Sequence, residues 1–98
     1  MKRRPDFVRM ACTSASVSFR EILAQDELIQ ALISGDVPKT RRAHLMCLLE
    51  EGPENLLKGL VEQVGELVSP EQVRNNLLKI AQELGVPDRV RAIFSSSR

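Results

Sequence analysis

The sequence predicts an all-α fold, a compact bundle of five or six short helices joined by short turns. Hydrophobic residues make up 43% of the chain, but aromatic residues only 3%, all of them phenylalanine. The core must therefore be built from aliphatic side chains, which suit helix packing, whereas sheets are rich in β-branched and aromatic residues. Apolar residues also recur at helical spacing, and glycines and prolines divide the chain into segments of helix length.

Chain length sets the domain organisation. A chain of 98 residues corresponds to about one small domain and has no room for a second core. We expect residues 1–98 to form a single helical domain, with a basic N-terminal tail at 1–4 and a frayed, serine-rich tail at 95–98. The charged fraction of 28% is typical of a folded domain rather than a disordered one.

The first helical segment is expected over residues 5–24. Pro5 and Asp6 are start signals, and the apolar residues near the end of the segment have helical spacing. Serine-rich sequence has weak helix propensity, which predicts a break or kink near residues 13–16.

Three helices are expected between residues 26 and 68. Asp26 is placed to cap a short helix that Gly35 ends, and Pro38 begins a strongly apolar helix that Gly52 ends. Pro53 then begins the next helix, so one corner combines a C-terminal glycine with an N-terminal proline. That helix has the most regular apolar spacing in the chain, at Leu56, Leu57, Leu60, Val61, Val64 and Leu67.

Two further helices complete the bundle. Ser69 and Pro70 form a cap-and-start signal, with Gln72 three residues after the serine as a capping box prefers, and Gly85 ends this helix. A last short helix is expected at about 88–94. From their places in the apolar stripes, we expect three side chains to be almost fully buried, those of Leu57, Leu60 and Leu78.

Several classes of function lack a signature. No apolar run is long enough to span a membrane and no apolar signal core follows the first residues, so we expect a soluble, cytoplasmic protein in a reducing compartment. Cys12 and Cys47 are expected to be free thiols, and His44, which stands without two further ligands, is expected at the boundary of its helix. With no activated nucleophile and no phosphate-binding loop, we expect neither catalysis nor a cofactor, a metal or a small-molecule substrate.

The charges instead favour a protein partner. Six residues at the two ends of the helix that follows Pro38 are the predicted binding residues: Lys39, Arg41, Arg42, Glu50, Glu51 and Glu54. Cations in a first turn oppose the positive end of the helix dipole, which costs a few tenths of a kcal/mol each. A complementary surface would offset that cost, and it could belong to another protein or to a second copy of this chain.

Nucleic-acid binding is the alternative. Lys2, Arg3 and Arg4 form a basic tail, and residues 80–94 resemble a helix-turn-helix in which Arg89 and Arg91 would reach the nucleic acid. Arg91, however, stands where that motif usually has a buried aliphatic residue. A glycine-terminated helix followed by a turn explains the same stretch without DNA.

The two segments RRAHLMCLLEEGPENLLKGLVEQV (41–64) and DELIQALISGDV (26–37) resemble helices of caspase recruitment domains, members of the death-fold superfamily. Such domains insert a separate helix between these segments, whereas this chain has only residues 36–40 there. Either that helix is missing or the bundle has another topology. The resemblance implies a small adaptor or regulatory module that assembles through charged helix surfaces.

Overall fold

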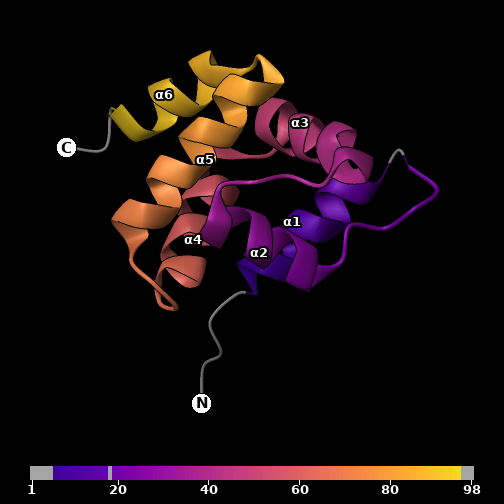
Figure 1. The fold of residues 1–98 in the computed structure, drawn as a ribbon, viewed down its shortest axis with the longest axis horizontal. Coiled ribbons are helices and arrows are strands. Elements are labelled where there is room, and N and C mark those ends of the chain that lie inside the picture. Colours follow the sequence, from indigo (N-terminus) through magenta and orange to yellow (C-terminus); the bar gives the residue numbers. More distant parts are fainter. Residues whose placement is uncertain (1–5, 18, 96–98) are drawn as a thin grey trace.

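The computed structural model describes residues 6–17 and 19–95, which form an all-α bundle (Figure 1). Its elements are α1 (Phe7–Ser16), α2 (Gln25–Ser34), a single 3-10 turn η1 (Lys39–Arg41), α3 (Arg42–Glu51), α4 (Glu54–Gly65), α5 (Pro70–Leu84) and α6 (Pro87–Ser95). These described residues contain no strand, so the predicted fold class is confirmed. The basic tail at 1–4, Pro5 and residues 96–98 lie outside the described part of the chain.

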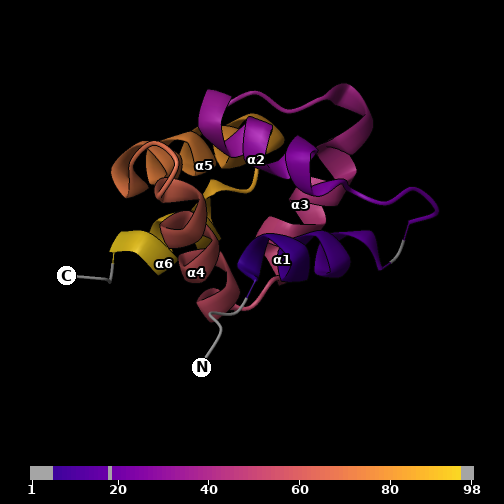
Figure 2. The same cartoon turned by 90° about the horizontal axis from the view of Figure 1, so that it is seen from below.

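The longest helix, α5, holds the bundle together. It packs against α4 on one side and α6 on another, and it also contacts α2 and α3. Helix α1 packs on α4 and closes the bundle against α2 and α3, as the two views together show (Figures 1 and 2). No helix in the described residues is both long and apolar enough to cross a membrane.

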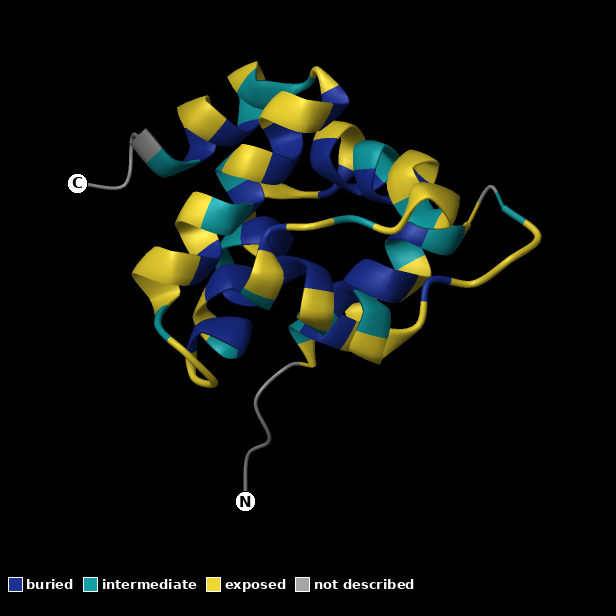
Figure 3. Ribbon diagram, viewed as in Figure 1, coloured by how far each residue is buried: buried dark blue, intermediate teal, exposed yellow. Residues whose placement is uncertain are grey.

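The core is aliphatic, as the composition predicts. Buried residues lie on the inward faces of the helices (Figure 3), and α5 contributes a stripe of Val73, Leu77, Ile80, Ala81 and Leu84. The expectation of burial is confirmed for Leu57 and Leu60, which are each 0% exposed. It is wrong for Leu78, which is only half-buried. The stripe centres on Leu77, and Leu78 lies one residue round the helix, toward α6.

The expected first helix is shorter than predicted. The predicted break near residues 13–16 is confirmed, because α1 ends at Ser16, but the segment after it forms a loop that leads to α2 instead of continuing the helix. The Ser16 hydroxyl accepts a hydrogen bond from the Leu23 N–H at 2.9 Å, and its carbonyl accepts one from the Phe19 N–H at 3.0 Å. Such local bonds replace those of a continuing helix. Within this loop the Leu23 side chain is buried, whereas the Ile22 side chain is 71% exposed.

Helix starts are partly as predicted. Ser69 caps α5, since its hydroxyl accepts a hydrogen bond from the Gln72 N–H at 3.0 Å. Asp26 does not cap α2, because the helix begins one residue earlier, at Gln25, with Ala24 at the N-cap position. The carboxylate of Glu27 reaches back to the Ala24 N–H at 2.9 Å, which supplies one half of a capping box.

The corner between α3 and α4 is a closely packed joint. Gly52 ends α3 with an extended backbone, and Pro53 is the N-cap of α4, which begins at Glu54. A Cβ atom on Gly52 would lie 2.5 Å from the Leu48 carbonyl oxygen, so only glycine fits. The corner is therefore a tight joint, and the exposed carboxylates surround it.

Candidate protein-binding surface

The predicted cations and carboxylates lie at opposite ends of α3. Lys39 in η1 and Arg42 at the first position of α3 are exposed, as are Glu50 and Glu51 in the last turn. Glu54 is also exposed, at the first position of α4. A helix of ten residues separates the two sets by about 15 Å at 1.5 Å per residue. We call Lys39 and Arg42 the basic end, and Glu50, Glu51 and Glu54 the acidic corner.

Arg41 is engaged inside the chain. Its Nη1 lies 3.1 Å from Glu21 Oε1 and its Nε lies 3.0 Å from Glu27 Oε1, and the side chain is 14% exposed. These two carboxylates, from the loop and from α2, offset the unfavourable position of Arg41 at the start of α3. Arg41 thus links the start of α3 to the preceding loop and to α2, and two carboxylates lie against its charge.

Glu27 joins the cap of α2 to this ion pair. The hydrogen bond from the Ala24 N–H, and then the one from Arg41, hold the pKa of its carboxyl below the usual range. A lowered pKa in the folded state contributes stability above the pKa of the unfolded chain. That contribution is lost as the pH falls through the lowered value.

His44 fixes the same loop from α3. Its Nε2 lies 2.7 Å from the Glu21 carbonyl oxygen, which requires the proton on Nε2, and its ring stacks on Phe19 with centroids 4.1 Å apart. The side chain is 4% exposed, and its Nδ1 has no hydrogen-bond partner among the described residues. His44 was expected at the helix boundary, but it is buried because the loop after α1 folds over it.

We expect His44→Ala to lower the free energy of unfolding by roughly 1–3 kcal/mol, because the Glu21 carbonyl and the Phe19 ring both lose their contact. Urea denaturation measures the loss. Arg42→Ala, at an exposed position in the same helix, is the control and should change stability by less than about 0.5 kcal/mol. Equal stabilities for the two variants would contradict a clamping role for His44.

Carboxylates of the acidic corner have few partners among the described residues. Glu54 pairs with Lys58 at 3.1 Å, one helical turn away, and Glu51 accepts a long contact of 3.8 Å from the Cys47 thiol. Glu50 lines a shallow hollow together with Asp88 and Arg89. Exposed pairs such as Glu54 and Lys58 contribute little to stability. The acidic corner therefore has three exposed carboxylates, of which only Glu54 forms an ion pair with a described residue.

The nucleic-acid residues are not assembled into one surface in the described part of the chain. Arg89 donates a hydrogen bond to the Leu49 carbonyl at 2.9 Å, which ties α6 to the end of α3. Arg91 is exposed on another part of α6. Lys2, Arg3 and Arg4 lie outside the described residues.

Both cysteines are free thiols in the structure. Burial, helped by nearby carboxylates, raises the pKa of Cys12 to about 11, and burial together with Glu51 also raises the pKa of Cys47. Thiolates are the reactive form, so neither thiol is prepared for nucleophilic chemistry. Among the described residues, no three His, Cys, Asp or Glu side chains are placed to hold a metal ion.

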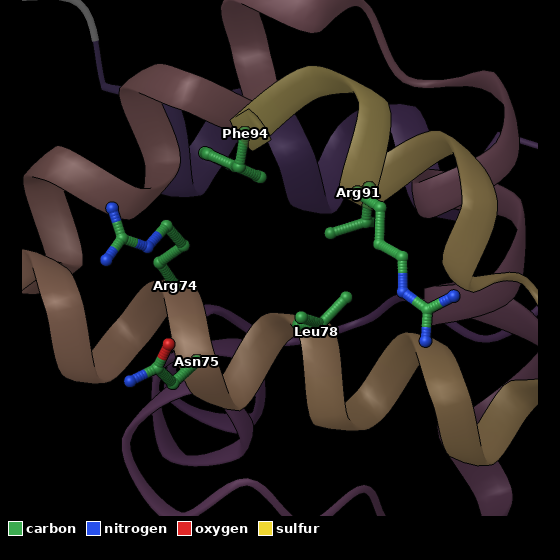
Figure 4. Close-up of a pocket in the computed structure, with 6 residues that line it drawn as sticks. Arg74, Asn75, Leu78, Arg91 and Phe94 are labelled. Atoms are coloured by element: carbon green, nitrogen blue, oxygen red, sulfur yellow. The ribbon is translucent and has the colours of Figure 1, made fainter. Parts of the chain in front are cut away.

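The sequence reasoning missed a groove between α5 and α6. It has a volume of about 490 Å³ and is lined by Arg74, Asn75, Leu78, Val90, Arg91 and Phe94 (Figure 4). The available signal was the pair Leu77 and Leu78, because two adjacent leucines widen an apolar stripe beyond a single helix face. Leu77 enters the core and Leu78 lines the groove.

Fold and surface together define an all-α domain whose third helix carries opposite charges at its two ends. Comparison with family models, with curated proteins and with solved structures finds no match to this chain. The resemblance to caspase recruitment domains stays a prediction. Where such a domain inserts a helix between the two matching segments, this chain has the single turn η1.

Proposed function

We propose that this domain is a protein-protein interaction module, a small adaptor or regulator that associates through the two ends of α3. The observation that carries the proposal is the separation of exposed charge along that helix. The basic end and the acidic corner carry opposite charges. Arg41, which lies between Lys39 and Arg42 in the sequence, is paired with Glu21 and Glu27 of its own chain.

A head-to-tail contact follows from this arrangement. The basic end of one copy meets the acidic corner of the next, and each copy keeps one free end of each sign. Such heterologous contacts give chains or filaments unless the rotation closes a ring. Charge supplies orientation and association rate, so the contact must also exclude water around the pairs.

Salt tests this proposal directly. We expect the weight-average mass in sedimentation velocity to rise with protein concentration at about 0.05 M salt and to fall toward the monomer at about 1 M, where the Debye length is about 3 Å. Lys39→Glu combined with Arg42→Glu should abolish the association at low salt, because like charges would then meet across the contact.

The control is Arg9→Glu combined with Arg74→Glu. This pair changes the net charge by the same amount at exposed positions on α1 and α5 that no contact links to either end of α3 in the described residues. It should associate as the unchanged protein does. A monomer at every concentration and salt level, or equal loss in both double variants, would contradict the proposed contact.

A further inference from the structure

We propose that the groove between α5 and α6 binds an acidic, aliphatic helical segment of another protein. This site lies apart from both ends of α3 and does not depend on self-association. It is the place where the described residues combine a recessed apolar surface with cations on its edges (Figure 4).

The groove has an apolar floor. Val90 is 1% exposed at its base, while Leu78 of α5 and Phe94 of α6 are half-buried along its walls. A volume of about 490 Å³ lies within the range of ligand-sized sites. A second hollow of about 290 Å³ shares Arg74 and Phe94 and extends the groove over α4. The two hollows together present apolar surface from α4, α5 and α6.

Cations flank the apolar surface. Arg74 stands on α5 and Arg91 on α6, with Leu78 between them in the close-up (Figure 4). Both arginines are exposed, and neither has a carboxylate partner among the described residues. The far hollow contains Lys58, which pairs with Glu54, and also Glu62. The potential over the main groove is therefore positive, and an occupant with carboxylates beside its apolar residues complements it.

Secondary structure favours a helix as the occupant. Strand addition by an extended peptide needs an exposed sheet edge, and the described residues contain no strand. An amphipathic helix instead lays its apolar face into a hydrophobic groove and anchors residues at i, i+3, i+4 and i+7. Acidic residues beside those anchors would reach Arg74 and Arg91.

The occupant is a different protein rather than a copy of this chain docking by its acidic corner. The corner offers carboxylates, but the leucines beside it, Leu48, Leu49 and Leu56, are buried in their own core. It has no apolar side chain to fill the groove. An anionic membrane is also a poorer match, because insertion needs protruding apolar residues, whereas Leu78 and Phe94 are recessed.

The probe is a fluorescein-labelled peptide of about 18 residues with leucines at i, i+3, i+4, i+7, i+10, i+11 and i+14 on one helix face, glutamates beside them and alanines elsewhere. Fluorescence anisotropy at a protein concentration below self-association should show saturable binding. Two peptide controls replace every glutamate by lysine or every leucine by serine, and both should bind at least about tenfold more weakly.

Arg74→Glu combined with Arg91→Glu should weaken binding of the acidic peptide by at least about tenfold and should instead favour the lysine peptide. Arg20→Glu combined with Lys79→Glu is the matched control, and it should bind within about twofold of the unchanged protein. Lys39→Glu combined with Arg42→Glu should also bind normally, which separates this site from the proposed self-association.

Three results would overturn the proposal. The first is no saturable binding of the acidic peptide. The second is equal binding of the serine peptide, which would show that charge alone is responsible. The third concerns the Arg74→Glu, Arg91→Glu variant: it binds the acidic peptide as the unchanged protein does but no longer self-associates, or no longer binds anionic vesicles. Loss of self-association would assign the groove to a copy of this chain, and loss of vesicle binding would assign it to a lipid surface.

Discussion

Leu60→Ala should lower the free energy of unfolding by about 2–5 kcal/mol, a large share of the stability of a small domain. Leu60 is 0% exposed at the centre of α4, where that helix packs between α1 and α5. Removing its branched end leaves a cavity that these helices cannot close without moving. Urea denaturation followed by circular dichroism measures the loss.

The matched control is Leu78→Ala, the same substitution at a half-buried position on the wall of the α5–α6 groove. Folding removes less apolar area from water at Leu78 than at Leu60, so the loss of stability should be only about 1–2 kcal/mol. A loss at Leu78 as large as that at Leu60 would mean that α6 covers the groove in solution.

Gly65→Ala should have the second large effect, a loss of about 1–3 kcal/mol. Gly65 is the last residue of α4, and a Cβ atom there would lie 2.6 Å from the Pro70 Cα and 2.7 Å from its nitrogen. These are backbone atoms at the start of α5, so the turn between the two helices would have to open. Alanine gains at most about 1 kcal/mol in helix propensity, which does not offset that clash.

Gly59→Ala provides the comparison within the same helix. A Cβ atom at Gly59 would meet the Phe7 ring at 2.5 Å, but those atoms are the far end of a half-buried side chain that can rotate away. Thermal denaturation should therefore show a clearly smaller drop in Tm for Gly59→Ala than for Gly65→Ala. The reverse order would place the tight packing at α1 rather than at the α4–α5 turn.

Local sequence signals predicted the elements whose determinants lie within a few residues. Ser69 and Pro70 start α5 as expected, and Gly35 and Gly85 end their helices with φ of 81° and 79°. The regular stripe of α4 predicted the burial of Leu57 and Leu60. Each of these features depends on residues three or four positions apart, which a sequence shows directly.

Features that depend on tertiary contacts were not predictable in the same way. The segment after α1 has helical spacing at Phe19, Ile22 and Leu23, yet it folds as a loop because Ser16 and His44 bind its backbone. The partners of Arg41 are 20 and 14 residues away in the chain. Long-range contacts of this kind override local propensity, and they give Arg41, a predicted binding residue, two partners within its own chain.

The groove escaped prediction for a related reason. Arg74 and Leu78 lie one turn apart on α5, but Arg91 and Phe94 belong to α6, and only the packing of α6 on α5 brings the four together. A sequence pattern shows which face of a helix is apolar. It does not show how much of that face a short neighbouring helix leaves uncovered.

The most direct test of the central claim, that the two ends of α3 meet in a head-to-tail contact, is a mixing experiment in sedimentation velocity. One variant carries Lys39→Glu and Arg42→Glu, and the other carries Glu50→Lys, Glu51→Lys and Glu54→Lys. Each alone should remain monomeric at low salt, and an equimolar mixture should associate, because every contact between the two variants again joins opposite charges. A mixture that stays monomeric, or single variants that associate as the unchanged protein does, would contradict the claim.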